Sequence, residues 1–156
     1  MICFSYTAPI LRLASIHSPK DSAMAGETDL NTLLASLAPC LNPGEYVFCC
    51  VSEPAPALLA RALGSFRESE GTTLILARGE AERLQLPYDY VAAWITLQVH
   101  SALAAVGLTA AFATALGRAG ISCNVIAGYH HDQLFVAHAD AERAMAVLRQ
   151  LAAEGC

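Results

Sequence analysis

The stretch from Trp94 to His138 constrains the fold of this chain most, because it places one amphipathic helix between apolar strands. Trp94–His100 is rich in β-forming residues and contains neither Gly nor Pro, so we predict a strand there. Ile121–Ala127 is predicted to be a second strand. After a turn at Gly128–Asp132, Gln133–His138 is predicted to be a third. The pattern indicates a βαβ unit followed by a hairpin.

The helix between the first two strands is indicated by a single apolar stripe with helical spacing. Its members are Leu108, Ala111, Phe112, Ala115, Leu116 and Ala119. Gly120 follows the stripe and favours the end of the helix. A crossover through a helix makes the two strands parallel, whereas the hairpin after them is antiparallel.

The first half of the chain shows a comparable order of elements. Thr28 or Asp29 is suited to cap a helix, whose apolar stripe is Leu30, Leu33, Leu34 and Leu37. Pro39 and the residues Asn42–Gly44 are predicted to end this helix and turn the chain. The later elements are expected to be a strand at Glu45–Ser52, a helix at Ala57–Leu63, a hairpin of Ser65–Glu70 with Thr72–Arg78, a helix at Gly79–Gln85 and a short strand at Tyr88–Val91.

The second half closes with a helix over Asp140–Ala153, for which Asp140 is the expected cap. Its predicted stripe is Ala141, Ala144, Met145, Leu148 and Leu151. Compared with the first half, the second lacks a final strand. We expect the first half to supply that strand.

The run VGLTAAFATALGRAGISCNVIAGYHHDQLFV resembles an ACT domain, a small regulatory module that often binds amino acids. In that pattern a Gly-Leu pair opens the helix and Ala-Gly-Ile closes it. Including the segments GETDLNTLL, LNPGEYVFC and SFRESEGTTLIL, the chain is similar to an uncharacterised bacterial family of small proteins with two ACT-like units. The similarity extends from Gly26 to Leu151.

This resemblance implies an α+β fold of two ferredoxin-like ACT-type units, each βαββαβ-like, with antiparallel sheets and helices packed on one face. We divide the chain into an N-terminal extension (1–25), an N-terminal ACT-like unit (26–92) and a C-terminal ACT domain (93–156). Pro9 interrupts the apolar run of the extension, and we expect it to be flexible, with Met24 as an alternative start of translation.

Composition excludes several classes of protein. The formal net charge is −5 and Lys20 is the only lysine, so no basic stripe is present and no nucleic-acid partner is expected. No apolar run reaches the roughly 18 residues of a membrane helix, and no signal peptide is recognisable, so we expect a cytoplasmic protein without a membrane partner. The apolar content of 55% and the sheet edges that such a fold exposes predict a homodimer.

The six cysteines have irregular spacing and form no CxxC pair, so we expect reduced thiols, not a disulfide framework or a zinc site. Cys49 and Cys50 lie on a predicted strand and are interpreted as small buried hydrophobes that point to opposite faces.

The start of the long helix is the strongest candidate for ligand binding. The first amides of a helix have no intrahelical acceptor, and Gly107 has no Cβ to keep a ligand carboxylate away from them. Asn124, on the next strand, offers an amide to the same ligand. Together with the resemblance, this predicts a ligand site at Val106, Gly107, Leu108, Thr109, Asn124, Val125 and Ile126.

Both signals have a purely structural alternative. Gly107 is equally explained by a turn, with Thr109 as the helix cap, and Asn124 by a hydrogen bond to the backbone at a sheet edge.

Catalytic and metal sites are less well supported. His130, His131 and Asp132 are adjacent, but neighbours on a strand face opposite ways, and a metal needs three or four convergent ligands, even if His100 and His138 approach. We therefore interpret the triplet as a polar hairpin tip. Cys123 beside a histidine lacks an orienting third group.

The Gly-containing segments match neither a P-loop nor a dinucleotide fingerprint, so no cofactor is expected. Three functions remain: a non-catalytic amino-acid sensor, which we favour, an interaction module without a ligand, and a small hydrolase or metal enzyme that uses His130, His131 and Cys123.

Overall fold

The helices and strands follow one another along the chain largely as the sequence predicts. The computed structural model describes residues 27–99 and 105–155. Its elements are α1 (Leu30–Ala35), β1 (Ala38–Leu41), β2 (Tyr46–Val51), α2 (Pro56–Leu59), β3 (Gly64–Arg67), β4 (Thr72–Ala77), α3 (Arg78–Arg83), β5 (Val91–Gln98), α4 (Leu108–Arg118), β6 (Cys123–Ala127), β7 (Asp132–Ala137), the 3₁₀ turn η1 (His138–Asp140) and α5 (Ala141–Glu154). The predicted N-terminal extension lies outside the described residues.

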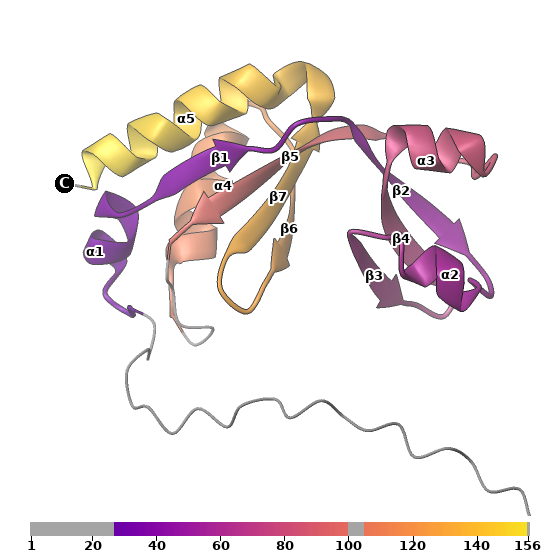
Figure 1. Cartoon of the computed structure of the whole chain (residues 1–156). Coiled ribbons are helices and arrows are strands. Elements are labelled where there is room, and N and C mark those ends of the chain that lie inside the picture. Colours follow the sequence, from indigo (N-terminus) through magenta and orange to yellow (C-terminus); the bar gives the residue numbers. More distant parts are fainter. Residues whose placement is uncertain (1–26, 100–104, 156) are drawn as a thin grey trace, which may run out of the picture.

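The second unit consists of β5, α4, β6, β7 and α5, with β1 as its fourth strand (Figure 1). The strands lie in the order β6-β7-β5-β1, and β1 pairs antiparallel with β5 so that Ala38 faces Gln98 and Leu41 faces Ile95. Because β7 is antiparallel to both of its neighbours, β5 and β6 are parallel, as the helical crossover requires. The expectation that the first half supplies the missing strand is confirmed.

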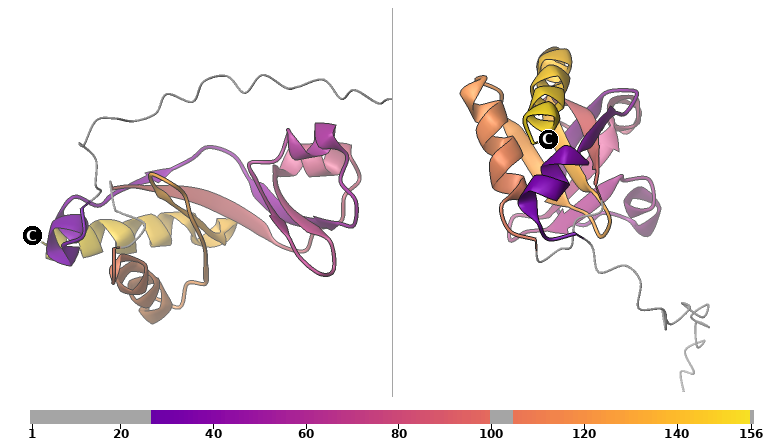
Figure 2. Two further views of the ribbon diagram at one scale, coloured as in Figure 1. Left: turned by 90° about the horizontal axis from the view of Figure 1, so that it is seen from below. Right: turned by 90° about the vertical axis from the view of Figure 1, so that its left-hand side faces the viewer.

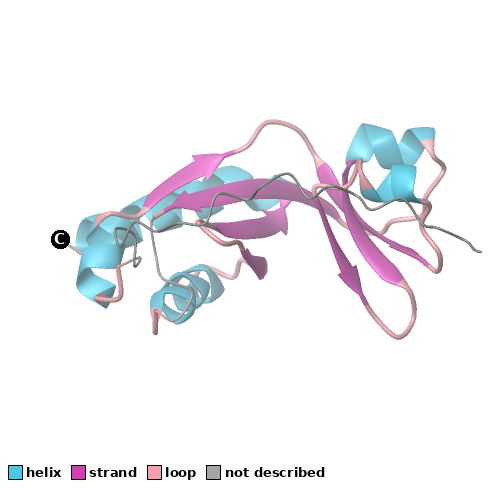
Figure 3. Cartoon of the chain, turned by 60° about the horizontal axis from the view of Figure 1, so that its bottom comes forward, coloured by secondary structure: helices cyan, strands magenta, loops and turns pink. Residues whose placement is uncertain are grey.

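The first unit uses the same connectivity, β2-α2-β3-β4-α3, and its fourth strand is the beginning of β5. Tyr46 and Val47 of β2 pair with Ala92 and Val91, whereas β5 pairs with β7 from Ala92 to Leu97 and with β1 from Ile95 to Gln98. One strand therefore belongs to both units and joins them into a single seven-stranded sheet (Figure 3). The predicted α+β fold of two ferredoxin-like units is confirmed.

The helices of each unit cover one face of the sheet, and the core of that unit lies between the helices and the sheet (Figure 2). In the second unit, α1, α4 and α5 pack on Ile95, Leu97, Leu134 and Val136 of the strands. The predicted stripe of α4 is confirmed, since Leu108, Phe112 and Leu116 are buried. In the first unit, a smaller core of Val47, Cys49, Leu74, Leu76 and Ala81 lies beneath α2 and α3.

The opposite face of the sheet carries aromatic side chains instead of helices. Phe48 of β2 and Phe135 of β7 meet edge to face with ring centroids 5.3 Å apart, as do Tyr46 and Trp94. The contact between Phe48 and Phe135 joins strands of different units, and Phe135 is almost completely buried without any covering helix. This contact therefore helps to fix the two units against each other.

Two predictions about strands are corrected. β1 falls in the segment that Pro39 was expected to turn, but a proline is tolerated on an edge strand, where its missing N–H is not needed for pairing. The separate short strand expected at Tyr88–Val91 does not form. Instead β5 begins at Val91 and continues to Gln98, because its two ends pair with different units.

Three local predictions also need correction. The carboxylate of Asp140 does not cap α5 but accepts a hydrogen bond from Nη1 of Arg143 at 2.5 Å. Cys50 is exposed, because the aromatic cluster on its face of β2 does not reach it, whereas Cys49 on the helical face is buried. α2 is a single turn ending at Leu59, since the backbone N–H of Leu63 pairs with Ile75 O in the sheet.

Candidate functional site

The start of α4 has the features expected of an anion-binding helix end. Leu108 is its first helical residue, and Gly107 precedes it with φ +104°. No described side chain caps this end. Thr109 therefore does not cap the helix, contrary to the structural alternative considered from the sequence. The first intrahelical bond runs from Ala111 N to Gly107 O at 2.8 Å. The amides before Ala111 therefore have no helical acceptor and are oriented toward the helix end.

Gly107 itself is explained by local structure. A φ of +104° strongly favours glycine, and a Cβ at this position would lie 3.1 Å from Cδ2 of Leu30 on α1. The missing side chain of Gly107 thus makes room for Leu30, not for a solvent-facing ligand.

Asn124 lies on β6, an edge strand of the sheet. Its Nδ2 donates to Phe135 O of the neighbouring strand at 3.4 Å, which matches the structural alternative considered from the sequence. Cys123 and Val125 pack toward the helices, so Asn124 and Ile126 point to the opposite face. The sheet therefore separates the Asn124 side chain from the start of α4.

The connectivity does bring the start of α4 and the end of β6 to the same end of the unit (Figure 1). Exposed apolar side chains are frequent at this end: Val106 is 85% exposed, Tyr129 79% and Ile126 42%. Of the predicted site residues, Val106–Thr109 lie at the same end of the unit as the end of β6, whereas the side chain of Asn124 is directed to the other face of the sheet.

The histidine triplet lies in the β6–β7 turn and its surroundings do not resemble a metal site. His130 is exposed and stacks edge to face on Tyr129, whereas Asp132 is buried at the start of β7, so the interpretation of a fully polar tip is wrong for Asp132. Within residues 27–99 and 105–155, no three His, Cys, Asp or Glu side chains are placed to hold a metal ion. His138 instead lies near Glu45, with Nδ1 3.6 Å from Oε1, and His100 lies outside the described residues.

Cys123 is a poor nucleophile in this environment. Burial raises the pKa of its thiol to about 11, so the group stays protonated at neutral pH. A cysteine that acts as a nucleophile needs the opposite shift.

Two hollows in the first unit bring together residues that the sequence did not single out as a site. One, of about 350 Å³, is lined by Ser52, Pro54, Leu59, Ser65, Arg67 and Thr72. The other, of about 310 Å³, shares three of these residues and is lined by Ser52, Glu53, Arg67, Glu68, Ser69, Glu70, Gly71 and Thr72. No sequence motif indicates them, because their walls come from three separate elements.

Two models of the ACT domain family match the chain, one over residues 25–93 and the other over residues 90–150. A protein of unknown function from Vibrio cholerae, described as a possible transport protein, is 46% identical over 79% of this chain and 95% of its own, with a TM-score of 0.72. The chain belongs to the ACT domain family. The ACT units meet in the shared strand β5, where the two matched ranges overlap.

More distant structures show the same ACT fold. The regulatory subunit of aspartate kinase from Thermus thermophilus has a TM-score of 0.53 at 9% identity, covering 74% of this chain and 98% of that one. A protein from Agrobacterium tumefaciens has a TM-score of 0.58 at 18% identity, covering 74% and 89%. None of the curated proteins matches. In the described part of the chain, no helix has the length and apolar character needed to cross a membrane.

Proposed function

We propose that this ACT protein is a non-catalytic regulator that binds a small molecule, an amino acid, at the start of α4. The observation that carries the proposal is the absence of any described side-chain cap on the first turn of this 11-residue helix. Free amides and the helix dipole together favour a carboxylate there.

The proposed contacts are the backbone amides of Leu108 and Thr109, with Val106 and the end of β6 beside them. Val125, on the helix-facing side of β6, lines the approach from that strand, whereas Ile126 points to the other face of the sheet. Asn124 is left out of the proposed contacts, because its amide donates to Phe135 O on the other face of the sheet. The protein is proposed to act as a cytoplasmic homodimer, with the two outer strands of the sheet available for pairing.

A thermal-shift screen with the common amino acids tests this function. A ligand that binds only the native state raises the free energy of unfolding by about 2.7 kcal/mol at a hundredfold excess over Kd. Gly107→Val is an unsuitable variant, because the new side chain would meet Leu30 and force a strained φ whether or not a ligand binds there.

Thr109→Glu tests the site without disturbing the fold. Thr109 is exposed in the first turn of α4, where a carboxylate stabilises the helix but repels an anionic ligand. We expect Thr109→Glu to keep or raise the melting temperature and to weaken binding about tenfold, whereas the neutral Thr109→Gln binds normally. If no amino acid stabilises the protein, or if both variants respond alike, a ligand-free interaction module is the better account.

A further inference from the structure

The side of the sheet that the helices leave uncovered, which we call the open face, carries no charged side chain along its described strands. These strands contain two charged residues, Arg67 on β3 and Asp132 on β7. Arg67 is on the same side of β3 as Ser65, which pairs with the core residue Leu74, and Asp132 pairs with the core residue Leu97. Both therefore belong to the face that the helices cover.

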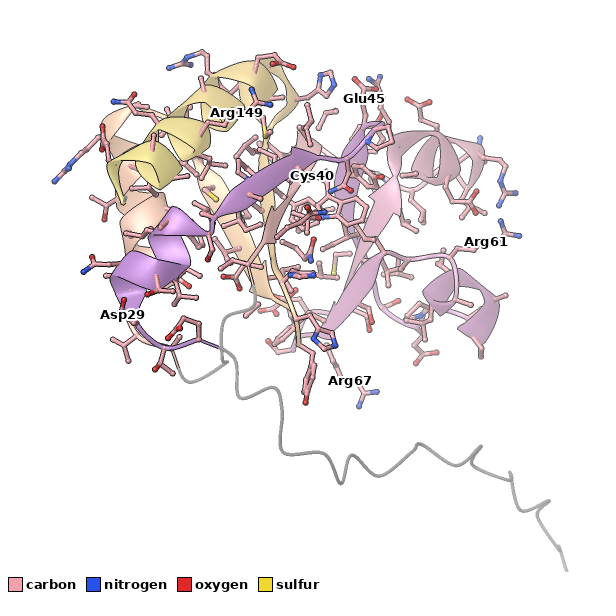
Figure 4. All side chains as sticks on the ribbon, turned by 60° about the vertical axis from the view of Figure 1, so that its left-hand side comes forward. Asp29, Cys40, Glu45, Arg61, Arg67 and Arg149 are labelled. Atoms are coloured by element: carbon pink, nitrogen blue, oxygen red, sulfur yellow. The ribbon has the colours of Figure 1, made fainter. Side chains whose placement is uncertain are left out.

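The charged side chains of the protein lie mainly on helices, loops and turns. Figure 4 shows Arg149 on α5 and Arg61 in the loop after α2, whereas Arg67 is on a strand. At the border of the open face, Glu68 in the β3–β4 turn accepts from the hydroxyl of Thr73. The outer face of an antiparallel sheet normally carries polar and charged residues that water can solvate. The open face lacks this feature of a surface that is exposed to water.

Polar side chains in the middle of the open face bond to one another. Trp94 Nε1 and Thr96 Oγ1 both donate to Gln133 Oε1, at 2.7 and 2.9 Å. Asn42 Nδ2 in turn donates to Thr96 Oγ1 at 2.9 Å. Polar groups that are already paired lose less free energy when water is removed from above them than unpaired groups do. This part of the face can therefore be covered at little cost.

The apolar side chains of the open face extend from one outer strand to the other. Phe66 on β3 is 72% exposed and Ile126 on β6 is 42% exposed, while Phe48 and Trp94 between them are half-buried. Aromatic enrichment together with depletion of charge is typical of the central part of protein–protein interfaces. The composition of the face thus points to a protein partner.

Charge favours a second copy of the chain as that partner. The formal net charge is −5, so two copies repel each other through most of their surfaces. At the open face they can approach without bringing carboxylates together. A different protein is usually selected by complementary charges, and the strands of this face offer none.

The size of the open face also suits a dimer. Six strands lie side by side from β3 to β6, which at about 4.8 Å per strand spacing gives a width of roughly 24 Å along the curled sheet. The 8 residues of β5 extend for about 26 Å. The projected area is therefore roughly 600 Å² before side-chain relief is added, of the same order as the roughly 800 Å² per partner of a stable interface.

We propose that two copies of this chain associate through their open faces, with Phe66, Trp94 and Ile126 of each copy in the contact. The two-fold symmetry of such a dimer places the same surface on both sides of the interface. This inference rests on the homodimer of the proposed function and assigns its interface to the open face. Pairing at the outer strands of the sheet is the competing arrangement.

Trp94 reports on this interface directly, because it is the only tryptophan of the chain and lies on the open face. The experiment is acrylamide quenching of its fluorescence in the full-length protein over a dilution series, with light scattering on the same samples. We expect quenching to decrease as the mass doubles. Pairing at strand edges would leave the exposure of Trp94 unchanged.

Phe66→Glu places a carboxylate in the proposed contact of both copies, and it should raise the dissociation constant of the dimer about tenfold or more. Phe66→Leu keeps the position apolar and should retain the dimer. Leu59→Glu is the matched control, because Leu59 is 40% exposed but lies on α2, on the helical side of the sheet. Circular dichroism verifies that each variant is folded.

The inference is overturned if the protein is a monomer at every concentration, if Trp94 is quenched equally in monomer and dimer, or if Phe66→Glu dimerises as well as Leu59→Glu. Protection of Trp94 in a monomer that is lost in a chain starting at Met24 would assign the open face to the N-terminal extension instead.

A thermal-shift measurement on the same samples separates this inference from the ligand site. A dimer that forms through the open face but is stabilised by no amino acid would refute the site at the start of α4 alone. A monomeric Phe66→Glu variant that an amino acid still stabilises would support both.

Discussion

Asp132 is the one charged side chain that the fold buries among the described residues, at 8% exposure. It begins β7, where its backbone pairs with Leu97 and Ala127 in the middle of the sheet. Burial raises the pKa of its carboxyl, since the charged form loses hydration. The folded state therefore holds the Asp132 proton more tightly than the unfolded chain does.

This shift determines how stability depends on pH. The contribution of Asp132 is most favourable below its unfolded-state pKa and is lost as the pH rises through the higher folded-state pKa. Asp132→Asn removes the buried charge, so we expect it to unfold at a higher temperature than the wild type at neutral pH. The difference should close as the pH falls through the folded-state pKa, which melting curves over a pH series would measure.

Asp89→Asn is the control for this series, because Asp89 is exposed and makes no hydrogen bond or ion pair to a described residue. It should follow the wild type throughout. A lower stability of Asp132→Asn at neutral pH would mean that the ionised carboxylate has a stabilising partner.

At the scale of elements, α1 and β1 precede the first unit in the chain but pack in the core of the second. Leu33 of α1 is fully buried with the residues of α4 and α5, and Asp29 caps the helix by accepting from Thr32 N at 2.9 Å. Gly155 allows close contact there, since a Cβ on it would lie 2.6 Å from Cβ of Leu34. The second unit is therefore completed by residues that lie before the first.

Leu33→Ala should accordingly destabilise the protein by about 2 to 5 kcal/mol, the cost of a cavity in a packed core. Leu63→Ala is the matched control, because Leu63 is 43% exposed, and its loss should cost less than about 1 kcal/mol. Unfolding by urea, followed by circular dichroism, compares the two variants. Equal losses would show that α1 is not part of the core in solution.

At the scale of the whole molecule, the continuous sheet ends in β3 on one side and β6 on the other. Unpaired strand edges invite pairing with a second chain. Aromatic side chains on the face without helices, among them the 72% exposed Phe66 on β3, add apolar surface near one edge. Both features favour association between copies of the chain.

Light scattering on the full-length protein and on a chain that starts at Met24 should therefore give a dimer in both cases, because the described edges are present in each. A monomer in both cases would contradict the proposal. A dimer of the full-length protein alone would assign the interface to the N-terminal extension.

The sequence by itself determined the elements whose signals are local. The stripe of α4, the strands around it and the order of elements in both units follow from periodicity, since backbone geometry repeats every 3.6 residues in a helix and every two in a strand. The start of α4, and with it the proposed position of Val106–Thr109, was predictable for the same reason.

Only the tertiary structure decided what depends on pairing between distant segments. The sequence favours a turn at Pro39, and only the pairing with β5 shows that it lies on an edge strand. For Asn124 the sequence allowed either a ligand contact or a backbone hydrogen bond, and the structure contains the hydrogen bond to Phe135 O. The surroundings of Arg67 are also assembled from separate elements, α2, β3 and β4, together with the loop that follows β2. Such features depend on which surfaces are buried together. Burial is a property of the whole folded chain, so the periodicity of a single helix or strand does not predict it.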